Sequence, residues 1–297
     1  MIIYFDLRVP TDANGEVVYE KIKIMLLILI ILLSCVFLLF FLSIWFFQNK
    51  LMFFPSDNIM NRSLMSQRVE YESIAVEGQT GNTYHGWIHR DDGASKYLVY
   101  FGGNAQCSAT AYSRFEEYDI WSYFNGYNFL MIDYSEFGLS EGEIGEESMF
   151  DMAQATYDYL LSQNVPPENI YVMGYSIGTG VAVYLSSIRE VGGLVLFAPY
   201  DDGVSLFNDK LNIFHGPLEG LVRNKLQSKI YAQEVRVQPL IVASVDDKVI
   251  PIALSEKLAE YFMIPPFFES VDDIGHNDLL YDPVSMAYVR EYLNQQV

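Results

Sequence analysis

Cysteine, histidine and basic residues are scarce in this chain of 297 residues. Of its two cysteines, Cys35 lies in an apolar run and Cys107 in a loop of the following domain, so they do not pair and there is no disulfide framework. Only 18 Lys and Arg residues stand against 38 Asp and Glu residues, which gives a formal net charge of −20. So acidic a chain argues against nucleic acid as a partner and against a domain that lies flat on anionic lipid. We interpret the excess acid as a solvated surface.

One long apolar run stands out near the amino terminus. Residues Ile24 to Phe47 include no charged side chain. As a helix these 24 residues span about 36 Å, enough to cross a hydrocarbon core of about 30 Å. We therefore predict a transmembrane helix at residues 24–47, after a short tail at residues 1–23. A cleaved signal peptide is the alternative, but the run is too long for one and no small residues follow it.

Charges on the two sides of this run indicate its orientation. Lys21 and Lys23 precede the run and Lys50 follows it. Cytoplasmic flanks carry the excess of Lys and Arg, so this distribution favours a single-pass membrane protein with its main domain on the non-cytoplasmic side. The residues from Leu51 to Pro55 are apolar as well. We expect them either to pack on the domain or to lie at the bilayer interface.

The rest of the chain, residues 51–297, alternates short apolar segments with helical patterns. The segments predicted as strands are 71–76, 83–89, 97–101, 127–134, 170–173, 193–197, 239–243 and 266–271. Helical spacing is clearest at residues 149–160 and 283–293. Such alternation predicts one α/β domain with a mostly parallel central sheet flanked by helices on both faces. Residues 200–236 contain no strand pattern, and we predict a small cap insertion there, over the site.

The strongest chemical signal is the pentapeptide Gly174-Tyr175-Ser176-Ile177-Gly178, which lies between a predicted strand and a helical pattern. Its two glycines remove the Cβ atoms that would clash in a sharp turn from strand to helix. Ser176 is then held up on the turn, next to the free N–H groups at the start of a helix, which stabilise an oxyanion. The pattern G-x-S-x-G also arises by chance in many chains, so a nucleophilic role for Ser176 requires partners.

Candidate partners follow two later strands. Loops after parallel strands meet at one edge of the sheet, where a base and its orienting carboxylate belong. Asp246 and Asp247 follow the strand at 239–243, and His276, the only one of four histidines beyond these acids, follows the strand at 266–271. A serine hydroxyl needs an imidazole to take its proton, and the imidazole needs a carboxylate to fix its tautomer. From the residues alone, Asp246 and Asp247 compete for the acid role.

Taken together, these motifs resemble the α/β-hydrolase superfamily, and within it the small membrane-anchored serine hydrolases. The resemblance runs from about Gln48 to the carboxyl terminus. It is carried by Gly174-Tyr-Ser-Ile-Gly178, Asp247-Lys-Val-Ile-Pro251, Gly275-His-Asn-Asp278 and Asp133-Tyr-Ser-Glu-Phe-Gly-Leu-Ser-Glu-Gly142. It implies an α/β-hydrolase fold, and it implies Asp247 as the acid, because this residue stands directly before Lys-Val-Ile-Pro.

The segment Gly102-Gly103-Asn104 resembles the His-Gly-Asn loop of this superfamily. The resemblance implies that the backbone N–H groups of Asn104 and Ile177 form the oxyanion hole. Two positions depart from the family pattern, because Gly102 replaces the usual histidine and Ser135-Glu136 replaces an Arg-Gly pair. We expect the first change to loosen the oxyanion loop. The second removes a positive charge near the site, which argues against carrying over substrates with an anionic head.

We interpret the chain as a membrane-anchored serine hydrolase that cleaves a carboxylic ester or thioester of an acyl or lipid-like substrate. Ser176 is the predicted nucleophile, His276 the proton carrier and Asp247 the orienting acid. No metal and no organic cofactor are implied. The alternative within enzymes is a serine peptidase or amidase that uses the same residues. The alternative from another class is a catalytically idle membrane-anchored binding protein, whose mark would be a broken set of catalytic residues.

Overall fold

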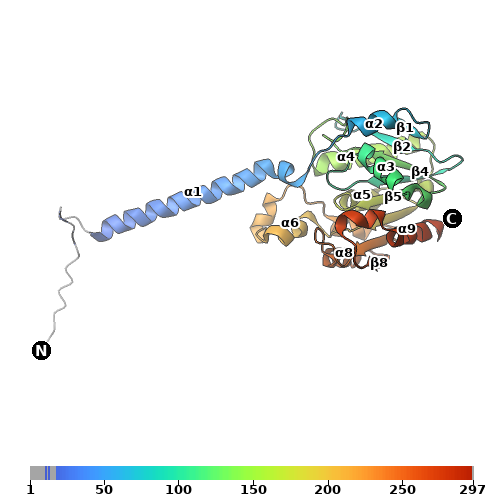
Figure 1. Ribbon diagram of the computed structural model, residues 1–297. Helices are drawn as coiled ribbons and strands as arrows, with labels where there is room; N and C mark the ends of the chain where they lie inside the picture. Colours follow the sequence, from blue (N-terminus) through green and yellow to red (C-terminus); the bar gives the residue numbers. More distant parts are fainter. Residues whose placement is uncertain (1–10, 12, 14–17, 296–297) are drawn as a thin grey trace. The chain divides into compact units, whose positions relative to one another are not determined.

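The computed structural model describes residues 11, 13 and 18–295 (Figure 1). The described residues form an eight-stranded sheet in the order β1-β2-β4-β3-β5-β6-β7-β8. Its strands are β1 (Tyr71–Glu77), β2 (Thr83–His89), β3 (Lys96–Phe101), β4 (Tyr127–Ile132), β5 (Ile170–Tyr175), β6 (Gly193–Phe197), β7 (Leu240–Ser244) and β8 (Phe267–Val271). β2 is antiparallel to β1 and to β4, and every other neighbouring pair is parallel. The predicted α/β fold with a mostly parallel sheet is confirmed.

Helices flank this sheet on both faces (Figure 1). The α-helices are α1 (Val18–Met52), α2 (Ile59–Met65), α3 (Ser108–Glu117), α4 (Glu146–Ser162), α5 (Gly178–Ile188), α6 (Gly203–Leu211), α7 (Ser228–Tyr231), α8 (Ile252–Ala259) and α9 (Pro283–Gln295). The 3-10 helices are η1 (Ile120–Tyr123), η2 (Pro167–Asn169), η3 (Gly216–Leu221), η4 (Ala232–Glu234) and η5 (His276–Tyr281). α5 packs on β5 and β6 and against α4, whereas α3 and α9 both contact η1.

The hydrophobic core lies along the central strands. Every residue of β4, β5, β6 and β7 is buried, which fits strands covered by helices on both faces and explains their continuous apolar sequences. The edge strand β1 instead alternates between buried and exposed side chains. The carboxyl ends of the buried strands therefore form a rigid edge on which loop residues are placed accurately.

The chain divides into two compact units, one up to Gln48 and one from Asn49 onward. The first unit contains most of α1, which includes the predicted span 24–47. Residues Lys21–Met52 form a helix with a mean hydropathy of 3.4 in its most apolar window, and none of that window is buried. This helix is long and apolar enough to cross a membrane, although a signal sequence near an amino terminus meets the same test. Residues 18–23 of the predicted tail are helical, and most of the tail lies outside the described residues.

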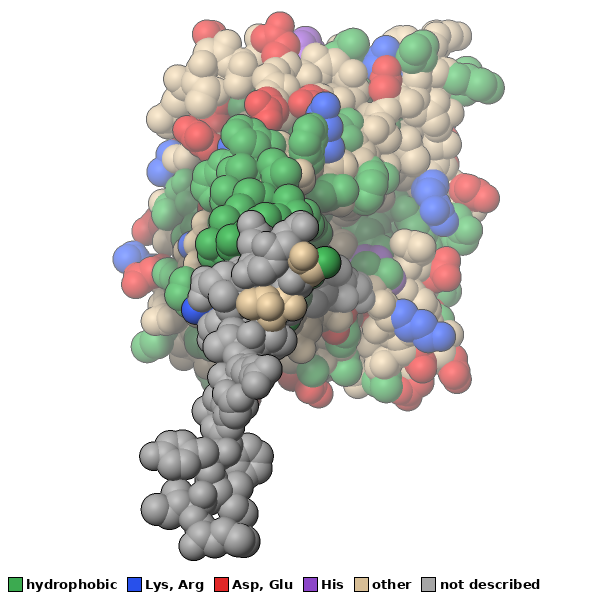
Figure 2. Space-filling model, turned by 90° about the vertical axis from the view of Figure 1, so that its left-hand side faces the viewer, with side chains coloured by type: hydrophobic (Ala, Val, Ile, Leu, Met, Phe, Trp, Pro, Cys, Tyr) green, Lys and Arg blue, Asp and Glu red, His purple; other side chains and the backbone are tan. Residues whose placement is uncertain are grey.

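The predicted cap at residues 200–236 lies between β6 and β7 and consists of α6, η3, α7 and η4. Asp202 caps α6 by accepting a hydrogen bond from the Ser205 N–H at 2.6 Å. Two ion pairs hold this start of the cap: Lys229 of α7 pairs with Asp202 within the cap, and Lys257 of α8 pairs with Asp201 at 2.5 Å and ties the cap to the rest of the domain. On the face that Figure 2 shows, acidic side chains are scattered over the domain, whereas the described part of α1 presents hydrophobic ones.

Candidate active site

Ser176 lies on the sharp turn between β5 and α5. Its backbone adopts a left-handed conformation with φ of +54°, which costs a residue other than glycine about 1–2 kcal/mol. The turn is held by hydrogen bonds from the Ser176 N–H to the Phe197 carbonyl at 2.9 Å and from the Thr179 N–H to the Ser176 carbonyl at 3.0 Å. These bonds and the packing of β5 and α5 keep the hydroxyl at the sheet edge.

The two glycines of the pentapeptide are required by close packing. A Cβ on Gly178 would lie 2.1 Å from the Phe101 carbonyl oxygen, and a Cβ on Gly174 would lie 2.7 Å from Thr179 Cα. Both clashes are with backbone atoms, which cannot move aside as a flexible side chain does. The sequence therefore has glycine where strand, turn and helix approach one another most closely.

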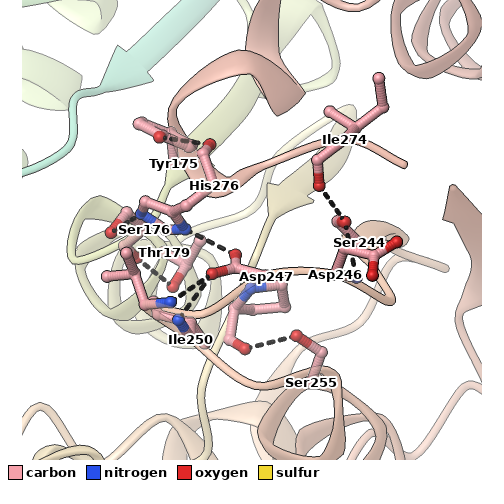
Figure 3. Close-up of polar contacts among 12 residues, drawn as sticks. Tyr175, Ser176, Thr179, Ser244, Asp246, Asp247, Ile250, Ser255, Ile274 and His276 are labelled. Atoms are coloured by element: carbon pink, nitrogen blue, oxygen red, sulfur yellow. Dashed lines mark hydrogen bonds and ion pairs between the residues drawn. The ribbon is translucent and has the colours of Figure 1, made fainter. Parts of the chain in front are cut away.

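His276 begins η5, directly after the loop that follows β8, and its ring bridges two side chains (Figure 3). His276 Nε2 lies 2.9 Å from Ser176 Oγ, and His276 Nδ1 lies 2.6 Å from Asp247 Oδ2. The second carboxylate oxygen of Asp247 accepts the N–H groups of Val249 and Ile250 at 2.7 Å and 2.8 Å. The structure thus brings all three residues into one hydrogen-bonded chain, and each of them is buried.

Asp246 points elsewhere. Its side chain is exposed, and its Oδ2 accepts a hydrogen bond from the Asp273 N–H at 2.8 Å. Asp247, one residue later, is only 6% exposed and faces His276. The turn after β7 therefore separates two neighbouring acids into one surface residue and one residue of the site.

Tyr175 supports His276 and was not singled out from the sequence. Its hydroxyl donates to the His276 carbonyl at 2.8 Å, and its ring stacks on the imidazole with 5.2 Å between ring centroids. Burial raises the pKa of Tyr175 well above its usual range, so the hydroxyl stays a neutral donor. The only sequence signal was its place in the pentapeptide, because the partner lies about a hundred residues further along the chain.

The loop at residues 102–106 lies beside Ser176. Among the described residues, no acceptor is found for the backbone N–H of Asn104 or for that of Ile177. The loop is held firmly, since Tyr134 donates its hydroxyl to the Gly102 carbonyl at 2.9 Å and Gln106 Oε1 accepts the Gly103 N–H at 3.0 Å. These bonds argue against the loosening expected from the glycine at position 102.

Position 102 itself is close to two flexible side chains. A Cβ on Gly102 would lie 2.7 Å from Met131 Cε and 2.9 Å from Gln106 Oε1, so a larger residue there would require these two side-chain ends to move. The second departure, Ser135-Glu136 in place of an Arg-Gly pair, is visible in the backbone conformation. Glu136 has φ of +66°, a conformation that suits glycine, and Ser135 is buried with no hydrogen-bond partner for its hydroxyl among residues 18–295.

An apolar cavity of about 210 Å³ opens next to Ser176. The residues that line it come from five segments of the domain, and they are Met52, Asn104, Ser176, Ile177, Leu206, Phe207, Val249 and Ile250. Leu206 and Phe207 belong to α6 of the cap, and no charged side chain lines the cavity. The space suits a hydrocarbon group better than a charged one.

Two other histidines have partners outside this set of three residues. His89 stacks on Trp121 with 4.0 Å between ring centroids, and burial lowers its pKa. His215 contacts Asn212 in the cap at 2.9 Å. Within the part of the chain that the structure describes, no group of three or more His, Cys, Asp or Glu side chains is arranged to hold a metal ion.

Comparisons with known proteins add relatives to this geometry. No family model matches the chain. An uncharacterized protein of Mycobacterium tuberculosis is 28% identical over 257 residues, which cover 85% of this chain and 89% of that protein. The alpha/beta hydrolase domain-containing protein aho-3 of Caenorhabditis elegans is 27% identical over 172 residues, which cover 57% of this chain and 49% of that protein.

Among solved structures, the esterase Pf2001 of Pyrococcus furiosus superposes with a TM-score of 0.63 at 18% identity. The match covers 82% of this chain and 98% of the esterase. At so low an identity the likeness shows that the two chains share a fold, and it leaves the chemistry to be argued from the residues.

Proposed function

We propose that this chain, which belongs to the α/β-hydrolase superfamily, is a serine hydrolase that forms an acyl-enzyme on Ser176. The observation that carries the proposal is the continuous hydrogen-bonded chain from Asp247 through His276 to the Ser176 hydroxyl. The names of its relatives, which include α/β-hydrolase proteins and an esterase, support hydrolysis as the general reaction.

The proposed reaction begins when His276 Nε2 takes the hydroxyl proton as Ser176 Oγ attacks the substrate carbonyl carbon. Asp247 holds the Nδ1 proton and stabilises the imidazolium that forms. The tetrahedral oxyanion then accepts hydrogen bonds from the backbone N–H groups of Asn104 and Ile177, neither of which has an acceptor among the described residues.

The tetrahedral intermediate collapses when its bond to the leaving oxygen or sulfur breaks, and His276 gives the proton to that atom. A water molecule next attacks the acyl carbon on Ser176, with His276 again as the base. The bond from that carbon to Ser176 Oγ then breaks, and His276 returns the proton to Oγ. The alcohol or thiol leaves in the first half of the reaction and the carboxylic acid in the second half. Every proton transfer therefore uses the same imidazole nitrogen.

The cavity supports an acyl ester or thioester as the substrate class. Its apolar lining from Met52, Phe207 and Ile250 lies beside the nucleophile, where an acyl chain would be placed during attack. Burial of such a chain contributes roughly 0.8 kcal/mol for each methylene group. A serine peptidase that uses the same residues is the competing hypothesis. Turnover rates on a panel of acyl esters and on a panel of peptides separate the two.

We further propose that α1 anchors the domain as a single-pass membrane protein. Its apolar length supports this role, and the Lys residues that flank the apolar run favour a non-cytoplasmic domain. A membrane anchor keeps the site close to lipid-like substrates. The proposed reaction uses no metal and no organic cofactor, and we expect no nucleic acid as a partner.

Replacement of the nucleophile tests the proposal. We expect Ser176→Ala to abolish turnover of p-nitrophenyl acyl esters and labelling by a fluorophosphonate, because no other group occupies the place of the hydroxyl. The circular dichroism spectrum and thermal midpoint should stay close to those of the wild type, since only one oxygen atom is removed. Turnover by the variant near the wild-type rate would refute the proposal.

A further inference from the structure

The residues that follow the apolar run lie against the loop at residues 102–106, and the side chain of Asn104 bonds two of them. We call residues 52–56, which begin with the last residue of α1, the post-helix segment. Asn104 Nδ2 donates to the Met52 carbonyl at 2.6 Å, and Asn104 Oδ1 accepts the Phe54 N–H at 2.9 Å. One side-chain amide thereby satisfies two backbone groups of the segment, as a neighbouring peptide group would.

Further contacts make the post-helix segment a wall of the site. Ser56 donates its hydroxyl to the Ala105 carbonyl at 2.9 Å, and the Ser56 carbonyl accepts the Gly138 N–H at 3.0 Å. Met52 and Phe53 are buried, and Met52 lines the cavity beside Ser176. Of the apolar residues 51–55, Met52 and Phe53 therefore pack on the domain as expected, whereas Leu51 and Phe54 are exposed.

The side chain and the backbone of Asn104 face different partners. Its Oδ1 accepts from the N–H groups of both Phe54 and Ala105, the latter at 3.1 Å, and its Nδ2 is committed to Met52. The backbone N–H, in contrast, has no acceptor among the described residues. The side chain is thus engaged in holding the loop, while the N–H is left for a ligand.

We infer that the Asn104 side chain is a positioning residue that aims its own backbone N–H at the oxyanion by clamping the loop to the post-helix segment. This inference rests on the proposed function. Asparagine suits the task because a short side chain offers one donor and one acceptor, whereas alanine would leave the Met52 carbonyl and the Phe54 N–H unpaired. An oxyanion donor acts through its distance and direction, so a small shift of the loop weakens the transition state more than the bound substrate.

The test uses the full-length protein in detergent micelles and a soluble p-nitrophenyl acyl ester. We expect Asn104→Ala to lower kcat by at least about tenfold with KM within about twofold, since complete loss of one oxyanion donor costs roughly 10²–10³ in kcat. The Ki of an acyl trifluoromethyl ketone, whose adduct with Ser176 carries an oxyanion, should rise by the same factor as kcat/KM falls. A residue with only a structural role would not produce this parallel.

Two further variants keep the test decisive. Ser56→Ala removes one bond to the same loop and should lower kcat by a smaller factor, which gives a result even where Asn104→Ala folds poorly. Asn58→Ala is the matched control, because Asn58 caps α2 by accepting the Asn61 N–H at 3.0 Å and makes no bond to the loop, so its kcat should be unchanged.

The outcomes separate the two proposals. A wild-type kcat in both Asn104→Ala and Ser56→Ala, or a ketone Ki that does not change while kcat falls, overturns the positioning role and leaves the serine mechanism intact. Full activity of Ser176→Ala in the same assay instead overturns the proposed function, whatever the result at Asn104.

Discussion

At the scale of single residues, the candidate site depends on which of two adjacent acids is turned inward. Asp247 is buried against His276, whereas Asp246 is exposed and bonds the Asp273 N–H. An inward carboxylate fixes the imidazole tautomer and stabilises its charged form, and an exposed one in a solvated turn does neither. One step along the chain therefore separates a group with a predicted role in the chemistry from one that stabilises a loop.

Substitution of each acid by its amide tests this difference. We expect Asp247→Asn to reduce kcat on a soluble ester by about 10⁴, as loss of the orienting carboxylate does in serine proteases. Asp246→Asn should leave kcat within about twofold, since among the described residues its carboxylate bonds only the Asp273 N–H in the loop after β8, and an amide oxygen can accept the same bond. Steady-state kinetics of the two variants make the comparison; the reverse order would assign the acid to Asp246, and equal losses would refute a role for Asp247 alone.

Single residues also show which features of the site could not be predicted from the sequence. The order of serine, acid and histidine, each after a separate strand, was enough to predict Ser176 and His276, while the residues alone left both acids open. Burial distinguishes them, and burial is a property of the folded turn. The support of His276 by Tyr175 could not be predicted, because it joins residues about a hundred positions apart.

At the scale of elements, the strands could be predicted because helices cover the sheet on both faces. β4 to β7 are buried at every position, so they appear in the sequence as continuous apolar runs. The post-helix segment has no such pattern. Its place against the loop is fixed by hydrogen bonds between side chain and backbone, from the Asn104 amide to Met52 and Phe54 and from the Ser56 hydroxyl to Ala105, and these leave no periodic signal in the sequence.

Helix α3 is joined to the sheet by a buried carboxyl group. Asp133 follows β4 and accepts the Ser108 N–H at 2.5 Å and the Ser108 hydroxyl at 2.9 Å, at the first residue of α3. Burial raises the pKa of Asp133 to about 7, even though the bonds from Ser108 act in the opposite direction. The unfolded chain releases this proton near pH 4 and the folded chain near pH 7, so folding stability falls as the pH rises between the two.

We expect Asp133→Asn to remove this pH dependence. The amide keeps an acceptor for the Ser108 N–H, and the Ser108 hydroxyl can turn to accept from the amide nitrogen. The free energy of unfolding of the variant minus that of the wild type should therefore increase between pH 4.5 and pH 8, by on the order of 3 kcal/mol. Denaturant unfolding of both proteins at the two pH values measures the gain. A difference that does not change with pH would mean that Asp133 is ionised in the folded protein.

At the scale of the whole molecule, the two units raise the question of where the active domain begins. The division falls at Gln48 and Asn49, yet the helix α1 continues to Met52. Asn49 already belongs to the domain, because its side chain donates to the Ile144 carbonyl at 2.8 Å and accepts from Asn224 at 2.7 Å. The domain therefore starts inside the last turn of α1, before the post-helix segment.

We predict that residues 49–297 fold and keep full activity on short soluble esters, because every residue assigned to the chemistry lies beyond position 100. Residues 57–297 should fold as well but lose most of kcat, since they lack the Met52, Phe54 and Ser56 contacts that hold the loop. The form 49–297 should lose rate only on long-chain lipids in liposomes, because the anchor that it lacks raises the effective concentration of the site at the surface without altering the site. Each form is compared with the full-length protein on both substrates after circular dichroism has shown it to be folded. Loss of soluble-ester activity in folded 49–297 would show that the apolar helix completes the site, and equal activity of 49–297 and 57–297 would show that the post-helix segment does not contribute to it.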